Sequence, residues 1–201
     1  MNKEKKQRIG DMQRQTKETD VKIKLNLDGA GTANIDTGVG FLDHMLELFA
    51  VHGGFDLDVQ CVGDIQVDAH HSVEDVGITL GRLINHLLGD KKGIERFADA
   101  AVPMDEALCR SVVDLSGRPY LSVKTAAGAE LAGKSGDFDL ELVEEFLRAV
   151  STYGLFTLHV IIEDGKNGHH IAEAVFKSFA RALKKAVRIV SDRIPSSKGV
   201  I

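Results

Sequence analysis

The 201-residue sequence has few of the residue types that crosslink a fold or recognise nucleic acids. It contains two cysteines, Cys61 and Cys109, no tryptophan, and only 5% aromatic residues. Both cysteines lie in apolar runs typical of strands, so we expect buried free thiols in a reducing compartment rather than a disulfide framework. The formal net charge of −5 and the scarcity of aromatic side chains argue against binding to a phosphate backbone and against base stacking.

Long apolar runs are also absent. No segment approaches the length of a membrane span, and the polar, basic start of the chain lacks the apolar segment of a signal peptide. We therefore expect a cytoplasmic protein that binds neither a membrane nor a nucleic acid. Its hydrophobic content of 43%, with 27% charged residues, is ordinary for a globular protein with a real core.

One short motif occurs twice. His70-His71-Ser72-Val73-Glu74 and His169-His170-Ile171-Ala172-Glu173 share the pattern HHxxE. Each copy follows a polar turn and begins a segment with helical apolar spacing. On a helix the first His and the Glu share one face, and the second His points about 100° further round. Each copy is therefore expected to give a His/Glu pair to one site and a single His to another.

The histidines and carboxylates of these motifs predict metal binding. Imidazole and carboxylate groups together suit borderline divalent ions such as Mn, Fe, Zn and Co. One copy alone could be a polar helix N-terminus, but two copies in matching contexts favour a metal. Aligning the apolar residues of segment 42–51 with those of segment 142–150 places Glu145 opposite His44. The candidate ligands are His44, His70, His71, Glu74, Glu145, His169, His170 and Glu173. Two sites of four ligands would leave open positions for a substrate, as catalysis requires.

The apolar spacing predicts an internal duplication. Alternation predicts strands at 21–27, 55–61, 107–115, 120–125 and 155–162, with a returning strand at 32–37 and a short one at 65–67. Helical spacing predicts helices at 42–51, 73–87, 142–150 and 171–187, and residues 128–136 form a glycine-rich loop. We expect an α+β fold of two half-domains, each a β-sheet with helices packed on one face. The expected boundaries are a flexible N-terminal segment 1–15, half-domains 16–92 and 93–190, and a C-terminal tail 191–201.

A larger set of motifs runs in order along nearly the whole chain after about residue 14. They are R-x-T-x-E-T at 14–19, L-N-L-D-G at 25–29, T-G-V-G-F-L-D-H-M-L at 37–46, G-D at 63–64, D-A-H-H-S-V-E-D at 68–75, M-D-E at 104–106, V-D-L-S-G-R-P at 113–119, T-L-H at 157–159, K-N-G-H-H-I-A-E-A-x-F-K at 166–177 and P-S-S-K-G at 195–199. This set resembles the imidazoleglycerol-phosphate dehydratase family of histidine biosynthesis.

The resemblance implies a duplicated fold similar to the second domain of ribosomal protein S5. It also implies two Mn²⁺ ions per active site and a large cubic homo-oligomer of 24 subunits, with the sites between neighbouring subunits. Many relatives have His where this chain has Glu145, although a carboxylate oxygen also binds Mn. The catalytic residues implied are Glu18, His44, His71, Glu74, His170 and Glu173.

The family's reaction removes water from imidazoleglycerol phosphate and gives imidazole-acetol phosphate. Metals bound to both ring nitrogens, as imidazolate, would let the ring expel the adjacent hydroxyl and form a diazafulvene-like intermediate. Glu18 is the expected general base. Cations and donors should hold the phosphate. The implied substrate-binding residues are Glu18, His52, Arg96, Arg118, Lys177, Ser196, Ser197 and Lys198.

Three other functions compete with this interpretation. A metal-storage protein would use His/Glu clusters without chemistry, and it would not need the predicted phosphate-binding residues. An S5-like RNA-binding module is disfavoured by the acidic balance. A metallohydrolase would also use open His/Glu sites to activate water, although the sequence contains no HExxH motif.

Overall fold

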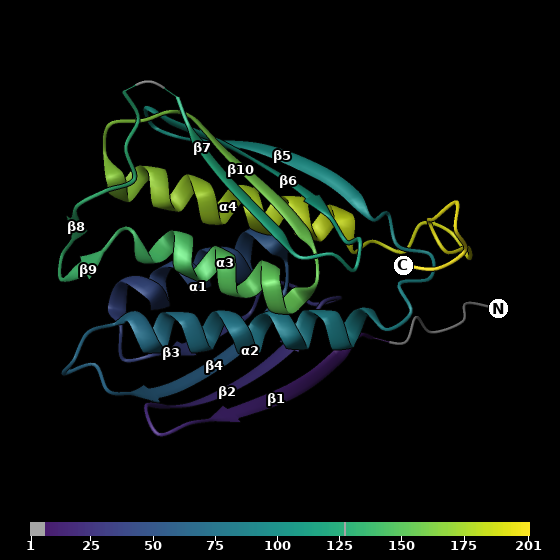
Figure 1. The fold of residues 1–201 in the computed structure, drawn as a ribbon, viewed down its shortest axis with the longest axis horizontal. Helices are drawn as coiled ribbons and strands as arrows, with labels where there is room; N and C mark the ends of the chain where they lie inside the picture. Colours follow the sequence, from purple (N-terminus) through teal and green to yellow (C-terminus); the bar gives the residue numbers. More distant parts are fainter. Residues whose placement is uncertain (1–6, 127) are drawn as a thin grey trace.

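The computed structural model describes residues 7–126 and 128–201, which form two four-stranded sheets with a layer of helices between them (Figure 1). The helices are α1 (Gly40–Gly53), α2 (His70–Leu88), α3 (Leu142–Gly154) and α4 (Gly168–Ala186). The first sheet has the order β1 (Ile9–Gln15), β2 (Thr19–Asn26), β4 (Asp56–Gly63), β3 (Ala33–Asp36). The second has the order β5 (Phe97–Met104), β6 (Ala107–Asp114), β10 (Thr157–Asp164), β7 (Tyr120–Thr125). A hairpin of β8 (Lys134–Ser135) and β9 (Phe138–Asp139) precedes α3.

The two sheets repeat one topology. In each, the first three strands in spatial order are antiparallel, and the last strand lies parallel to its neighbour: β3 along β4, and β7 along β10. Helices α1 and α2 cover the first sheet, whereas α3 and α4 cover the second. The expected α+β duplication, with helices on one face of each sheet, is confirmed.

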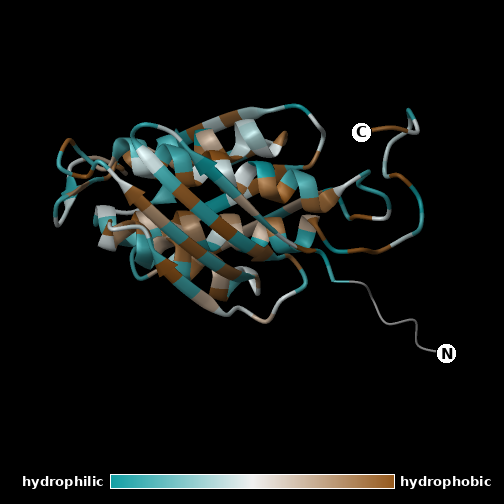
Figure 2. Ribbon diagram, turned by 90° about the horizontal axis from the view of Figure 1, so that it is seen from below, coloured by the Kyte–Doolittle hydropathy of each residue, from teal (hydrophilic) through white to brown (hydrophobic). Residues whose placement is uncertain are grey.

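Alternation in the strands explains why one face of each sheet is buried. In β2, Val21, Ile23 and Leu25 are buried against the helices, and Lys22 and Lys24 are exposed. Figure 2 looks onto the first sheet and shows this alternation along its strands. Because side chains on a strand point alternately to opposite faces, a strand with this pattern can cover the core on one side only.

The halves join through their helices: α2 packs on α3, and α1 on α4. A Cβ on Gly81 of α2 would lie 2.5 Å from the carbonyl oxygen of Val150, so only glycine permits this close approach. Between α1 and α4, the rings of Phe49 and Phe179 lie 5.4 Å apart. The histidine-bearing helices are thus held in one rigid layer.

Several details differ from the sequence-based expectations. Residues 9–15 form β1 rather than part of a flexible segment, because they pair with β2 along its whole length; residues 1–6 of that segment lie outside the described residues. The strand expected at 32–37 is shorter and pairs with β4, not with β2. Residues 65–67 form a turn instead of a strand, closed by the bond from the Val67 amide to the Asp64 carbonyl, 2.8 Å. Strand β5 was not predicted.

Both cysteines are buried free thiols, as expected. Burial raises the pKa of Cys61, and it raises that of Cys109 to about 12, so neither is a ready nucleophile. Within the described part of the chain, no helix is long and apolar enough to span a membrane.

Candidate active site

The two HHxxE motifs begin α2 and α4 at the same end of the helical layer (Figure 1). Equivalent side chains fix the two starts. Asp68 accepts a hydrogen bond from the His70 amide, 2.8 Å, and Asn167 accepts one from the His169 amide, 3.0 Å. Such capping satisfies amide groups that have no partner inside the helix. It also places all four histidines in the first turns, where they are partly exposed.

His44, His169 and Glu173 form a compact group of metal-ligating side chains. Their donor atoms lie within 4.8 Å of one another. The Nε2 atoms of His44 and His169 lie 2.9 and 3.2 Å from Oε1 of Glu173. Two imidazoles and one carboxylate match the preferences of a borderline divalent ion. The group joins α1 of the first half to α4 of the second.

Glu173 is held ionised at this position. It is 7% exposed, and its second oxygen, Oε2, accepts a hydrogen bond from the Lys177 ammonium, 2.6 Å. Burial alone would raise the pKa of Glu173, but bonds from Lys177, His44 and His169 lower it to about 2. Oε1, which faces the two histidines, is therefore the carboxylate oxygen of Glu173 that is left to bind a metal.

The second histidine of each motif points to a different set of carboxylates. Nδ1 of His71 lies 3.1 Å from Asp64, and Nδ1 of His170 lies 2.8 Å from Glu106. These bonds raise the pKa of both histidines, and His170 lowers that of Glu106 to about 2. A carboxylate at Nδ1 fixes the tautomer, so Nε2 is the nitrogen left for a ligand.

Glu18 lies beside His71 because its loop is anchored. Thr16 Oγ1 accepts bonds from the amides of Glu18 and Thr19, 3.1 and 3.0 Å. The buried carboxylate of Asp75 accepts bonds from Arg14 and from the Thr19 hydroxyl. Glu18 Oε1 is thereby held 3.9 Å from Nε2 of His71, with its side chain 55% exposed. In the second half, Asp105 occupies the matching place, 4.0 Å from Nε2 of His170.

The remaining predicted ligands do not form a second group like the first. Among the described residues, only His44, His169 and Glu173 bring three metal-ligating side chains this close together, so His70, Glu74 and Glu145 belong to no such group. The Glu145 carboxylate lies 3.7 Å from Nε of Arg148 on its own helix. In this single chain, the structure brings together only part of the predicted ligand set.

The predicted phosphate-binding residues divide between two places. His52, at the end of α1, lies near Lys177 and Arg181; burial and these two cations lower its pKa. Arg96 and Arg118 lie far from the HHxxE motifs, at the other end of α4, where the Arg96 amide donates to the Ala186 carbonyl, 2.9 Å. Since a helix rises about 1.5 Å per residue, these ends are about 25 Å apart.

The C-terminal tail lies beside these arginines. Arg96 donates to Asp114, 2.8 Å, and to the Pro195 carbonyl, 2.7 Å. Arg118 approaches the same Asp114 carboxylate at 3.8 Å. The predicted residues Ser196, Ser197 and Lys198 directly follow Pro195, and the Lys198 amide donates to Ser196 Oγ, 3.2 Å. One acidic and several basic side chains thus gather around the tail.

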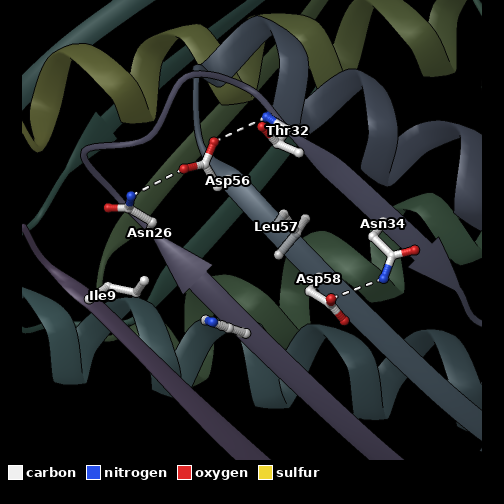
Figure 3. A pocket seen from close by; sticks show the side chains of 8 residues that line it. Ile9, Asn26, Thr32, Asn34, Asp56, Leu57 and Asp58 are labelled. Carbon is white, nitrogen blue, oxygen red and sulfur yellow. Dashed lines mark hydrogen bonds between the residues drawn. The ribbon is translucent and has the colours of Figure 1, made fainter.

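A cavity of about 820 Å³ opens at the motif end, lined by His44, His169, Phe41 and Phe138 among others. A smaller hollow of about 190 Å³ lies on the first sheet (Figure 3). Its polar groups already bond one another: Asp56 accepts from Asn26, 3.1 Å, and Asp58 from Asn34, 3.0 Å. Because the polar side chains of the smaller hollow are already bonded to one another, we assign them a structural role. The larger cavity is the candidate site.

Comparison with known proteins agrees with the geometry. A sequence profile described as imidazoleglycerol-phosphate dehydratase matches residues 37–183. An imidazoleglycerol-phosphate dehydratase of Methylorubrum extorquens is 52% identical over 195 residues, covering 96% of this chain and 98% of its own. One from an Exiguobacterium species is 53% identical over 196 residues, with the same coverage. The chain belongs to the imidazoleglycerol-phosphate dehydratase family.

Solved structures of dehydratases of this family share the fold. The enzyme from Staphylococcus aureus superposes with a TM-score of 0.79 at 43% identity, covering 90% of this chain and 99% of its own. The Pyrococcus furiosus enzyme, in complex with (S)-C348, gives a TM-score of 0.80 at 35% identity, covering 94% and 100%. The family and the hydro-lyase class expected from the motifs are confirmed.

Sequence reasoning assigned no role to several residues that shape this dehydratase site. Asp64 and Glu106 orient histidines, and Asp114 holds two arginines. Ser135 Oγ lies 3.1 Å from Nδ1 of His169. Asp64, Glu106 and Asp114 lie inside the quoted motifs G-D, M-D-E and V-D-L-S-G-R-P, which was the available signal. Ser135 lies in the glycine-rich loop, where no pattern marked it.

Proposed function

We propose that this chain removes water from imidazoleglycerol phosphate, with two Mn²⁺ ions at each active site. The observation that carries the proposal is the His44, His169 and Glu173 group beside a cavity, in a chain of this family. When bound, the ions would act as Lewis acids toward the imidazole ring and hold it in place. Two imidazole nitrogens and one ionised carboxylate oxygen fit such an ion.

The second histidines supply further ligands in this proposal. Asp64 bonds Nδ1 of His71, and Glu106 bonds Nδ1 of His170, so Nε2 of each ring points away from that bond. The neutral form of each histidine is the one that binds metal, and its bound proton stays on Nδ1. The proposed ligands remain His44, His70, His71, Glu74, Glu145, His169, His170 and Glu173.

Glu18 is proposed to remove the carbon-bound proton. Its carboxylate is more than half exposed and lies next to Nε2 of His71, so it can face a substrate held there. The Thr16 and Asp75 contacts hold the loop that carries it. A positioned carboxylate can take a proton from one atom and return it to another as the enol becomes the ketone.

The separation of the two ends of α4 supports an active site shared between subunits. Two groups of side chains lie at opposite ends of α4: the histidines at its start, and Arg96, Arg118 and the tail at its end. At a rise of about 1.5 Å per residue, they are about 25 Å apart in one chain. A substrate whose ring and phosphate are joined by three carbons cannot span that distance. We therefore propose that the tail end of one subunit completes the histidine end of a neighbour, in the homo-oligomer of 24 subunits that the family resemblance implies.

Metal dependence is tested by turnover of chelator-stripped protein, with and without added Mn²⁺. Activity should vanish on stripping and return with Mn²⁺, with imidazole-acetol phosphate as the product. Metal uptake without any turnover would instead support a metal-storage protein.

The shared site is tested by mixing subunits. His44→Ala damages the histidine end and Arg96→Ala the tail end, so each variant alone should be nearly inactive. Co-assembled oligomers of the two should regain part of the activity, because some sites pair an intact histidine end with an intact tail end. The matched control mixes His44→Ala with Glu173→Ala, which damage the same end, and should regain none. No recovery in the first mixture would contradict a shared site.

A further inference from the structure

His169 differs from the second histidines of the two motifs in what its Nδ1 atom contacts. His71 and His170 have carboxylates at Nδ1, whereas His169 has the hydroxyl oxygen of Ser135, at 3.1 Å. Nε2 of the same ring lies 3.2 Å from Oε1 of Glu173, on the side of the metal-ligating group. Because Nε2 must carry no proton when it binds an ion, the proton lies on Nδ1, which donates to the Ser135 hydroxyl.

The hairpin of β8 and β9 places Ser135 beside this ring. Ser135 pairs with Phe138, and Gly136 in the turn between them has a φ of +62°, in the left-handed region that favours glycine. The hairpin continues into Leu140, which packs on the start of α4: its Cδ1 atom lies 2.4 Å from the place that a Cβ of Gly168 would take. The loop that carries the hydroxyl is therefore in contact with the first residue of the helix that carries the histidine.

An aromatic contact from the same hairpin supports the ring of His169 from the side. Phe138 is 5% exposed, and its ring lies 4.8 Å from that of Phe41 on α1. The Phe41 ring in turn meets the His169 ring at 5.3 Å and an interplanar angle of 79°, an edge-to-face arrangement. Two residues of the hairpin thus restrain His169, Ser135 directly at Nδ1 and Phe138 through Phe41.

The ring would otherwise be free to turn toward water. Ser135 and His169 both line the cavity of about 820 Å³, and the His169 side chain is 40% exposed. Without the hydroxyl, a water molecule in the cavity would have to serve as the partner of Nδ1. Neither the orientation of the ring nor the position of its proton would then be set by the protein.

We propose that the β8–β9 hairpin is a clamp on the proposed metal ligand His169, with Ser135 as a positioning residue that keeps the proton on Nδ1 and directs Nε2 toward Glu173. This inference rests on the proposed function. The Ser135 hydroxyl is neutral, so it fixes the ring without adding a negative charge beside the ionised Glu173. Loss of an outer hydrogen-bond partner commonly lowers metal affinity about 10- to 100-fold, and a neutral acceptor should lie near the lower end of that range.

The test is Mn²⁺ titration of the assembled, chelator-stripped enzyme. Ser135→Ala removes the acceptor and should weaken Mn²⁺ binding about five- to tenfold, with the melting temperature of the stripped protein unchanged. Ser135→Thr keeps the hydroxyl and should stay within about twofold of the wild type. The matched control, Ser122→Ala, removes a half-buried hydroxyl from β7, outside the cavity lining, and should leave the affinity unchanged. Unchanged affinity in Ser135→Ala, or an equal loss in Ser135→Thr, would overturn the inference.

A gain of affinity separates hydrogen bonding at Nδ1 from a merely structural role. Ser135→Asp places a carboxylate at Nδ1, as Asp64 does for His71, and should tighten Mn²⁺ binding about three- to tenfold. Lys134→Gln changes the charge of the hairpin by the same amount, but Nζ of Lys134 lies 3.4 Å from Asp139 on the neighbouring strand, so the gain should stay below about twofold. Equal gains in the two variants would show that charge alone sets the affinity, against the proposed clamp.

Failure of this inference is distinguishable from failure of the proposed function, because the titration requires no substrate. The proposed function fails, and the clamp stands, if Mn²⁺ binds and Ser135→Ala weakens it but the wild type does not turn over imidazoleglycerol phosphate. The clamp alone fails if the wild type is active with Mn²⁺ and Ser135→Ala binds the ion as tightly. A wild type that binds no Mn²⁺ would overturn both.

Discussion

In the first half of the chain His71 is oriented by Asp64 and faces Glu18, and in the second half His170 is oriented by Glu106 and faces Asp105. The two Nδ1 distances, 3.1 and 2.8 Å, and the two Nε2 distances, 3.9 and 4.0 Å, nearly repeat. The carboxylates that make these contacts belong to different sequence motifs in the two halves. The duplication has therefore preserved the orientation of the second histidine while exchanging the residue that provides it.

The first histidines do not repeat in this way. His169 joins His44 and Glu173, and Lys177 binds the same carboxylate one turn later. In the first half the position one turn after Glu74 is Ile78, which is buried, and His44 is replaced by Glu145. The His44 group thus combines two imidazoles and one carboxylate with a lysine, whereas its proposed counterpart of His70, Glu74 and Glu145 would have one imidazole and two carboxylates. The two proposed metal sites differ in charge and in ligand hardness.

The largest effect should follow from removing the ligand that joins the halves. His44→Ala takes one imidazole from the best-formed group, so bound Mn²⁺ should fall and turnover should drop about 100-fold or more. Metal content by mass spectrometry and steady-state turnover measure this. The matched control is His86→Ala, which removes an exposed histidine from α2 and should leave both quantities unchanged. Full metal content in His44→Ala would contradict the assignment.

Acid should destabilise the second-half group selectively. The folded-state pKa of Glu173, about 2, lies below its ordinary 4.5, so its ionisation stabilises the fold above pH 4.5 and that contribution is lost as the pH falls toward 2. The shift corresponds to on the order of 3 kcal/mol. Urea unfolding of metal-free protein should show a smaller decline in Glu173→Gln than in the wild type, because other carboxylates with lowered pKa values, such as Glu106, remain. Glu74→Gln, the first-half counterpart, should retain the decline; equal slopes for wild type and Glu173→Gln would contradict the prediction.

The structural features that the sequence predicted correctly are local ones. The V-K-I-K-L-N-L alternation predicted β2, and the HHxxE spacing predicted two helix starts and the divergence of neighbouring histidines. Strands β1 and β5 were missed because both lie at sheet edges: β1 has few apolar residues, and β5 carries Pro103 and no clear alternation. An edge strand buries too little to impose a pattern.

The parts that sequence left open depend on packing between distant elements. Aligning the apolar residues matched His44 with Glu145, but it did not show that His44 joins the motif of the other half. That pairing follows from α1 lying on α4. Likewise, the sequence predicted a continuous helix over 171–187, but it did not show that Arg96 lies at the far end of that helix, about 25 Å from the histidines at about 1.5 Å per residue.

Removing each orienting carboxylate should test whether the second histidines are equivalent. Asp64→Asn and Glu106→Gln keep the size of the side chain but weaken the bond to Nδ1, so Mn²⁺ affinity should fall about 10- to 100-fold in each. Metal titration of the stripped variants measures this. A loss in one variant only would show that the two halves use their second histidines differently, against the near-identical distances.

The smallest effect should come from making the halves more alike. Glu145→His gives the first half the imidazole that His44 gives the second, and it removes one negative charge from a group that lacks a lysine. Because imidazole suits a borderline ion better than a second carboxylate does, affinity for Zn²⁺ relative to Mn²⁺ should rise severalfold, with Mn²⁺-supported turnover within about threefold of the wild type. Competition between the two ions in stripped protein measures the ratio. Glu144→His, one residue earlier and paired with Arg148 at 2.5 Å, is the matched control and should leave the ratio unchanged. An unaltered ratio in Glu145→His would mean that residue 145 does not reach the metal, and that the first-half site takes its remaining ligand from elsewhere.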